Sequence, residues 1–368
     1  MQGEERGIWD IFCQVIDNYG DLGVSWRLAT QLARRGHSVR LWVDDASALS
    51  WMAPGGCDGV STHGFAQAGE DFVPGDVVIE AFGCTVPPAV VGAIAQANRV
   101  RAAESGQGGI PWINLEYLSA ESWVARSHGL ASPVHGGAEA GIRKWFFFPG
   151  FTEDTGGLLR EPDLMAERAG FDRATWLAQR GIAWHGEPIV TLFCYEPPHL
   201  AELLRALART PVLLLVAAGR ATAAVRAVQA GAGCAGEAAG PGRIVFLPFV
   251  PQAEFDRVLW CGDCNFVRGE DSLVRALWAG APFVWQPYPQ EDAVLGAKLA
   301  ALLDWLGAPE SLRRFHRVWN GLEPGNLAAE LAPAAPQAWR DCVARARARA
   351  LAQDDLVSRL LRFAAKNR

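Results

Sequence analysis

The sequence lacks the phosphate-binding loops of dinucleotide-binding and P-loop enzymes. No Gly-x-Gly-x-x-Gly follows its first apolar segment, and no Gly-x4-Gly-Lys-Ser/Thr occurs in its 368 residues. Each of these loops cradles phosphate groups through glycine backbone, so their absence weakens two interpretations of the chain. One is a nicotinamide-dependent dehydrogenase, and the other is a nucleoside triphosphatase.

An excess of positive charge and long apolar runs are also missing. The net charge is −6 and the isoelectric point is near 5.7, which gives no support for a nucleic-acid partner. No stretch reaches the ~18 apolar residues of a membrane-spanning helix, and the first six residues form no leader. We therefore expect a soluble, cytoplasmic protein without a membrane partner. The basic residues are almost all arginine, and the only lysines are Lys144, Lys298 and Lys366. We interpret this as a bias of composition.

Metal-binding and nucleophile motifs are absent as well. Cys261 and Cys264 have Cys-x-x-Cys spacing, but no second Cys or His pair follows at the distance that a zinc site needs. The seven histidines form no ligand spacing, and no Gly-x-Ser-x-Gly occurs. We therefore predict no metal and no cofactor, and we interpret the eight cysteines as reduced thiols.

What is present is ordinary globular composition with an alternating pattern. Half of the residues are apolar and a fifth are charged, and the length suffices for two domains. Residues 8–16 are typical of a buried strand, 24–35 of a helix that ends at Gly36, and 38–43 of a second strand. This βαβ unit predicts an α/β fold with parallel strands.

The turn between the first strand and the helix carries two carboxylates. Segment 17–23 has the sequence Asp-Asn-Tyr-Gly-Asp-Leu-Gly. Ligands of parallel sheets bind outside the carboxyl ends of strands, so Asp17 and Asp21 are candidates for acid/base or orienting roles. The structural alternative is a turn in which Asp and Asn bond their own backbone.

The alternation stops near residues 146–151 and restarts at a strand over 189–194. We expect two doubly wound domains, 1–155 and 156–351, with a C-terminal helix in 352–368 that crosses back to the first domain. Ligand sites favour such domain interfaces.

A second polar turn follows the strand predicted at 265–267. Its residues Arg268, Glu270, Asp271 and Ser272 precede a helix, whose N-terminus could bind a diphosphate. The alternative is that Asp271 or Ser272 is only the N-cap, worth about 1 kcal/mol, and that Arg268 and Glu270 form a surface pair. Tyr288 and Gln290, after the next strand, could bind a base or a sugar, or belong to an ordinary proline-rich loop.

Several segments together resemble one family. They are residues 15–28, 114–123, 146–151, 268–272 and 282–290, in the expected order and spacing. They are similar to motifs of the elongation factor P arginine rhamnosyltransferases (EarP). The resemblance implies a GT-B glycosyltransferase fold, with two Rossmann-like doubly wound domains facing one cleft.

The resemblance also implies an inverting, metal-independent transfer of L-rhamnose from dTDP-β-L-rhamnose to one arginine of translation elongation factor P. It places the acceptor on the first domain and the donor nucleotide on the second. Carried over by motif, Asp17 and Asp21 are the N-terminal acids and Glu270 is the acid of the donor loop. Acceptor contacts would be Asp17, Asn18, Tyr19, Gly20 and Asp21, and donor contacts would be Arg268, Asp271, Ser272, Tyr195, Gln252, Tyr288 and Gln290.

An arginine acceptor explains why carboxylates are needed. The guanidinium has a pKa above ~12 and delocalised lone pairs, so it is a poor nucleophile. We expect Asp21 to orient it and to take a proton late in the transition state, while Asp17 holds its plane. Alternatives are a GT-B transferase with another sugar or acceptor, and a non-catalytic binding protein of the same fold.

Overall fold

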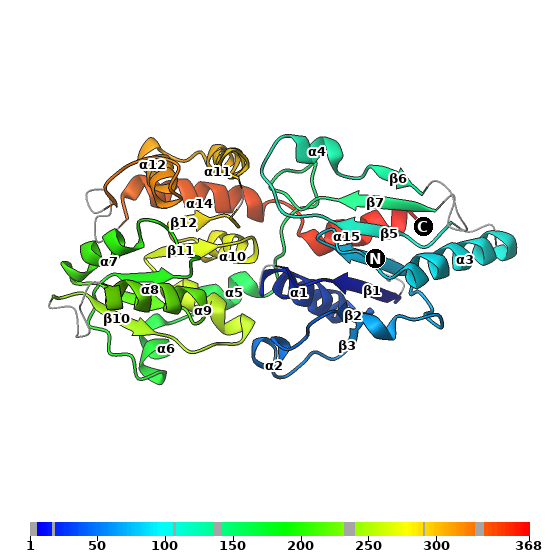
Figure 1. Ribbon diagram of the computed structural model, residues 1–368, viewed down its shortest axis with the longest axis horizontal. Helices are drawn as coiled ribbons and strands as arrows, with labels where there is room; N and C mark the ends of the chain where they lie inside the picture. The colour runs from blue at the N-terminus through cyan, green and yellow to red at the C-terminus, as the bar shows by residue number, and fades with distance from the viewer. Residues whose placement is uncertain are drawn as a thin grey trace. The chain divides into compact units, whose positions relative to one another are not determined.

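The computed structural model describes residues 6–16, 19–105, 108–134, 142–231, 240–289, 291–327 and 335–368. Contacts divide the chain into two compact units. Unit 1 comprises Met1–Glu161 and Gln353–Arg368, and unit 2 comprises Pro162–Ala352. Each unit is a mostly parallel sheet with helices against it (Figure 1).

Unit 1 has a seven-stranded sheet in the order β3-β2-β1-β4-β5-β7-β6. Neighbouring strands are parallel except β6, which runs antiparallel to β7. The order reverses between β1 and β4, which makes this position the switch point where ligands of such sheets bind. The strands are β1 (Ile8–Cys13), β2 (Ser38–Val43), β3 (Val60–Gly64), β4 (Val77–Ala81), β5 (Trp112–Leu115), β6 (Ala131–Pro133) and β7 (Arg143–Phe147).

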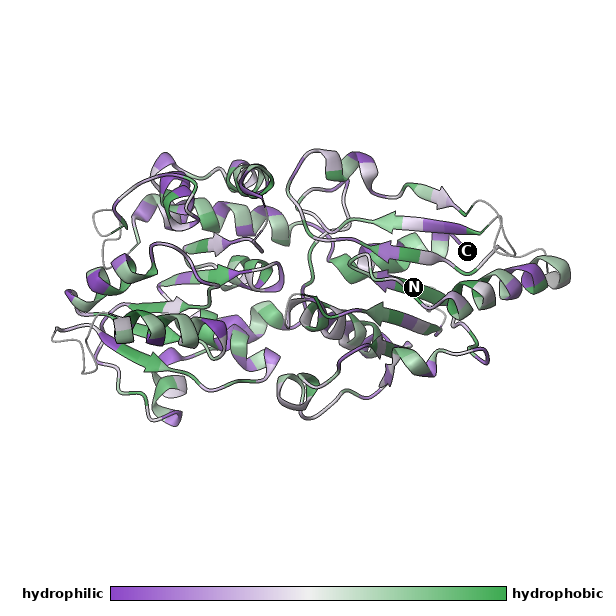
Figure 2. Cartoon of the chain, in the orientation of Figure 1, coloured by the Kyte–Doolittle hydropathy of each residue, from purple (hydrophilic) through white to green (hydrophobic). Residues whose placement is uncertain are grey.

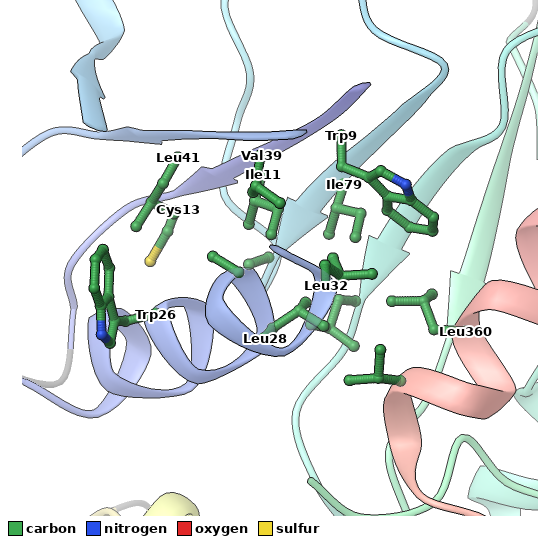
Figure 3. Packing of buried hydrophobic residues seen from close by; sticks show 14 of the residues in the cluster. Trp9, Ile11, Cys13, Trp26, Leu28, Leu32, Val39, Leu41, Ile79 and Leu360 are labelled. Carbon is green, nitrogen blue, oxygen red and sulfur yellow. The ribbon is translucent and has the colours of Figure 1, made fainter. Parts of the chain in front are cut away.

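Two helices from opposite ends of the chain cover one face of this sheet. They are α1 (Gly20–Arg34) and α15 (Leu356–Lys366). Leu28 and Leu32 of α1 meet strand residues such as Ile11, and Leu360 of α15 joins the same core (Figure 3). The helix predicted at 24–35 thus begins earlier, at Gly20, and ends as predicted before Gly36, whose φ of 92° suits glycine.

The other helices of unit 1 connect strands or cover the opposite face. The core on that face includes Phe12 of β1, Trp42 of β2 and Ile94 of α3. The elements are α2 (Leu49–Met52), the 3-10 turn η1 (Phe65–Gln67), α3 (Pro88–Ser105) and α4 (Trp123–Ser127). Helix α3 is 18 residues long.

Unit 2 has a five-stranded parallel sheet in the order β10-β9-β8-β11-β12. Its order reverses between β8 and β11, so unit 2 repeats the doubly wound arrangement of unit 1. The strands are β8 (Ile189–Leu192), β9 (Leu213–Val216), β10 (Arg243–Phe246), β11 (Cys264–Arg268) and β12 (Phe283–Gln286).

The strands of unit 2 are short and mainly apolar, and Figure 2 shows most of them in green. Continuous apolar strands are expected where helices cover both faces of a parallel sheet. The helices are α5 (Leu164–Ala169), α6 (Arg173–Gln179), α7 (Leu200–Ala208), α8 (Arg220–Gly231), α9 (Gln252–Cys261), α10 (Asp271–Ala279), α11 (Asp292–Leu306), α12 (Glu310–Trp319) and α14 (Gln337–Leu351).

Candidate active site

Asp21 lies in the first turn of α1, directly after β1 and therefore at the switch point of the unit 1 sheet. Tyr19 is the N-cap residue of this helix and Gly20 is its first residue. The Asp21 side chain is 4% exposed, and its Oδ2 accepts a hydrogen bond from the Ile16 backbone N–H at 2.9 Å. The positive end of the helix dipole favours a carboxylate here. Asp17 and Asn18 lie outside the described residues.

A buried thiol and an aromatic side chain lie near Asp21. Burial raises the pKa of the Cys13 thiol to about 12. The thiol therefore stays protonated and adds no charge. Tyr19 packs edge-to-face on Trp51, with ring centroids 5.0 Å apart, which fixes the aromatic side chain that precedes the acid.

Two further strand ends of unit 1 carry polar and aromatic groups that the sequence analysis did not assign to the site. Phe82, after β4, has a φ of 58°, a conformation that is rare for a bulky residue and is often found at functional sites. Its ring stacks on that of Tyr117 at 5.0 Å. Glu116, after β5, accepts a hydrogen bond from Asn114 at 2.7 Å, and burial raises the pKa of this carboxyl.

Arg268 ends β11 at the switch point of unit 2. Its side chain is 7% exposed, and the centre of its guanidinium lies 4.5 Å from the rings of both Phe193 and Tyr195. These rings come from the segment after β8, the strand beside β11. Stacking on aromatic faces holds the planar cation in place. Phe193 is a member of this cluster that the sequence analysis missed.

The turn between β11 and α10 is closed by its own backbone and by Ser272. The Arg268 N–H donates to Ser272 Oγ at 3.0 Å, and the hydroxyl donates back to the Arg268 carbonyl. Gly269 has a φ of 62°, which glycine adopts without strain. Its carbonyl accepts a hydrogen bond of 2.6 Å from Trp285 Nε1. The N-terminus of α10 is therefore presented by a rigid turn.

Glu270, rather than Asp271 or Ser272, is the N-cap residue of α10, and its side chain makes no capping bond. Its Oε1 instead lies 2.9 Å from Nζ of Lys298 on α11. Glu270 thus forms an ion pair with a lysine from another helix. Asp271 begins α10, where a negative charge is favourable.

The remaining predicted donor residues lie on neighbouring segments of the same edge. Tyr195 is buried, and its backbone N–H donates to Gln286 Oε1 at 2.9 Å. Tyr288 is 42% exposed and packs edge-to-face on Tyr195 with ring centroids 5.9 Å apart. Gln252 begins α9 after β10, close in sequence to the exposed Phe249. Gln290 lies outside the described residues.

A cavity of about 800 Å³ in unit 2 lies elsewhere, at the amino ends of β9 and β10. It is mainly apolar and is bordered by Arg205, Arg209 and Arg243. Ligands of doubly wound sheets bind at the carboxyl ends, so we do not assign the donor to it. Among the described residues, no group of three acidic, His or Cys side chains could hold a metal ion, and no helix is long and apolar enough to cross a membrane.

Comparison with known proteins identifies this arrangement. The model of the family "Elongation-Factor P (EF-P) rhamnosyltransferase EarP" matches residues 9–365. A protein-arginine rhamnosyltransferase of Pseudomonas putida is 42% identical over 388 residues, covering 97% of this chain and 98% of the relative. One from Pseudomonas aeruginosa is 43% identical over 339 residues, covering 85% and 86%.

Solved structures agree with the fold. One, described as "Structural basis for EarP-mediated arginine glycosylation of translation elongation factor EF-P", is 31% identical with a TM-score of 0.65 and covers 99% of this chain and 100% of its own. An Arabidopsis thaliana enzyme solved with UDP-L-rhamnose is 13% identical with a TM-score of 0.51 and covers 99% of both chains, a likeness of fold alone. The fold is that of the GT-B glycosyltransferases, and the chain belongs to the family of elongation factor P rhamnosyltransferases, EarP.

Proposed function

We propose that this enzyme transfers L-rhamnose from dTDP-β-L-rhamnose to an arginine nitrogen of translation elongation factor P. The observation that carries the proposal is the family match over residues 9–365. Two relatives above 40% identity are named protein-arginine rhamnosyltransferases. The carboxyl edges of the two sheets supply the two kinds of chemistry that such a transfer needs, a carboxylate for a cationic acceptor and a cation with a helix N-terminus for a diphosphate.

Unit 2 binds the donor in this proposal. The diphosphate lies at the N-terminus of α10, where backbone N–H groups and the helix dipole favour an anion. Arg268 adds a charge whose position is fixed by two aromatic rings. Ser272 supports the turn through its bonds to Arg268. The base and sugar lie against the remaining donor contacts, Asp271, Tyr195, Gln252, Tyr288 and Gln290.

Unit 1 binds the acceptor arginine through segment 17–21. Asp21 is the described carboxylate of this segment, and its orientation is fixed by the hydrogen bond from Ile16. Two carboxylates can grip the guanidinium fork and orient one nitrogen. Asp17 holds the guanidinium plane, and Asn18, Tyr19 and Gly20 complete the contact.

The transfer is a single displacement with inversion. The acceptor nitrogen forms a bond to the anomeric carbon while the bond from that carbon to the diphosphate oxygen breaks, through an oxocarbenium-like transition state. Asp21 takes a proton from the guanidinium while the nitrogen–carbon bond forms, because the positive charge of the guanidinium group would otherwise rise. Arg268 and α10 stabilise the negative charge of the leaving dTDP, so we propose that no metal ion is needed. Glu270 acts on the donor side of the reaction.

The test is incubation of the purified enzyme with elongation factor P and dTDP-β-L-rhamnose, followed by intact mass spectrometry. We expect a mass increase of one deoxyhexose on elongation factor P, unaffected by chelator. UDP- and GDP-sugars and an elongation factor P whose acceptor arginine is replaced by lysine are the matched controls. The proposal would be contradicted if elongation factor P gained no mass, or gained mass only with UDP- or GDP-sugars. Metal independence would be contradicted if chelator abolished the transfer and magnesium restored it.

A further inference from the structure

Glu270 is held by an ion pair that has no obvious structural purpose. Lys298 Nζ lies 2.9 Å from Glu270 Oε1, and the two side chains are only 16% and 18% exposed. Lys298 belongs to α11, whose residues Leu295 and Leu299 are buried in unit 2. The position of the lysine is therefore fixed by core packing, and the lysine holds the carboxylate from a different helix.

The ion pair joins the Glu270 carboxylate to a helix other than α10. Glu270 is the N-cap residue of α10, but its side chain makes no capping hydrogen bond. A carboxylate at this position is attracted to the N–H groups and the positive dipole of the first turn. The ammonium of Lys298 on α11, at 2.9 Å, competes with that attraction.

The N-terminus of α10 is also where the donor diphosphate binds in the proposed function. Two anions at one helix N-terminus repel each other strongly at partly buried sites. Here the negative groups are Glu270 and Asp271, and the facing cations are Arg268 of β11 and Lys298 of α11. Without Lys298, the Glu270 carboxylate would lose this cation and could turn toward the helix N-terminus and the diphosphate.

We propose that Lys298 is a positioning residue for donor binding, which acts by pairing with Glu270 so that the carboxylate does not compete with the diphosphate. The proposal rests on the proposed donor site. The choice of lysine supports it, since 34 basic residues include only three lysines. A lysine ammonium is a compact charge that grips one carboxylate, whereas an arginine fork also binds phosphate bidentately.

A double-mutant cycle tests this role, with dTDP affinity measured by calorimetry. We expect Lys298→Met to weaken dTDP binding by about tenfold, because the lysine no longer holds the Glu270 carboxylate away from the diphosphate. Glu270→Gln removes that carboxylate, so adding Lys298→Met to it should change dTDP affinity by less than about twofold. In turnover assays, Lys298→Met should raise the donor KM more than it lowers kcat.

Matched variants separate this role from a general loss of charge or of folding. Lys366→Met removes an exposed lysine from α15 of unit 1 and should leave dTDP affinity unchanged. Lys298→Arg keeps the charge and should retain most of the affinity. If Lys298→Met unfolds the protein, the same cycle is run with Lys298→Gln.

Equal weakening of dTDP binding by Lys298→Met with and without Glu270→Gln would overturn the proposal, because Lys298 would then act on the diphosphate directly. Unchanged affinity in Lys298→Met would overturn it as well. If the wild-type enzyme binds UDP or GDP but not dTDP, the proposed donor is wrong. The double-mutant cycle is then measured with the nucleotide that binds, and it decides the role of Lys298 separately. Binding of none of the three would overturn both.

Discussion

The surroundings of Asp21 fix the orientation of this candidate catalytic side chain. Its carboxylate accepts a backbone hydrogen bond and lies in the first turn of α1, where the helix dipole attracts negative charge. The neighbouring Cys13 stays protonated because burial raises its pKa to about 12. A carboxylate that is fixed in orientation suits the proposed guanidinium acceptor, which must be held and then deprotonated.

Asp21→Asn should lower kcat by about 100-fold or more, because the amide keeps the shape of the side chain but cannot accept the guanidinium proton. The measurement is single-turnover rhamnosylation of elongation factor P, with the thermal unfolding midpoint as the check on folding. Asp172→Asn is the matched control, since Asp172 is exposed and caps α6 in unit 2. A near-normal rate for Asp21→Asn would remove Asp21 from the role of base.

At the scale of elements, α15 returns the end of the chain to the unit 1 core. Asp355 accepts a hydrogen bond from the Ser358 N–H at 3.1 Å, which caps the helix. It also accepts one of 2.8 Å from Arg35, the C-cap residue of α1. Leu356, Val357 and Leu360 are buried beneath. The two helices that cover the sheet are thereby joined at their ends as well as through the core.

Asp355→Ala should destabilise unit 1 by about 1–2 kcal/mol at neutral pH, chiefly through the lost cap. Burial raises the pKa of Asp355, but hydrogen bonds from Ser358 and Arg35 outweigh it and leave this pKa below the ordinary value of 3.8. The contribution of the charge is therefore present above pH ~4 and is lost as the pH falls through the lowered pKa. Urea unfolding at pH 7 and at pH 3 measures the difference.

Asp355→Asn is the control for this substitution, because asparagine caps helices about as well as aspartate but carries no charge. It should lose only the ion pair, about 1 kcal/mol or less. A constant difference between wild type and Asp355→Ala at both pH values would contradict the electrostatic part of the argument.

The elements that the sequence predicted are those with strong local patterns. The βαβ unit at the start of the chain and the β11–α10 turn were both predicted, because apolar strands end there at glycine and polar residues. β3 (Val60–Gly64) was missed, since it is a largely exposed strand with polar residues. β7 (Arg143–Phe147) was missed because it begins with two basic residues and has only one buried position. Propensity gives little information where tertiary pairing decides the strand.

The same reason explains which site residues the sequence could supply. The sequence predicts Asp21 and Arg268 as candidates because each lies close along the chain to the end of a predicted strand. Phe193 was not, because its contact with Arg268 joins strands that are neighbours only in the folded sheet. Lys298 lies in the middle of a helix, 28 residues from Glu270, and no local pattern marks such a pair.

At the scale of the whole molecule, the two units repeat one topology with different chemistry. Both sheets reverse their strand order beside the first strand of the unit, at β1/β4 and at β8/β11. The carboxylate edge belongs to unit 1 and the cationic, aromatic edge to unit 2. One fold thus supplies two candidate binding edges of different chemistry, as the proposed transfer between a cationic acceptor and an anionic donor requires.

Hydrogen–deuterium exchange in the intact enzyme tests whether the donor binds to unit 2 and the acceptor to unit 1. Saturating dTDP should slow exchange in unit 2, around the β11–α10 turn and the start of α9, because a bound diphosphate uses backbone N–H groups at the helix N-terminus. Elongation factor P should slow exchange in unit 1, around Tyr19 and the first turn of α1. UDP at the same concentration is the control for the nucleotide, and an unrelated acidic protein is the control for the acceptor. Protection by dTDP at the start of α1 without protection at α10 would reverse the assignment, because the diphosphate would then lie beside the Asp21 carboxylate.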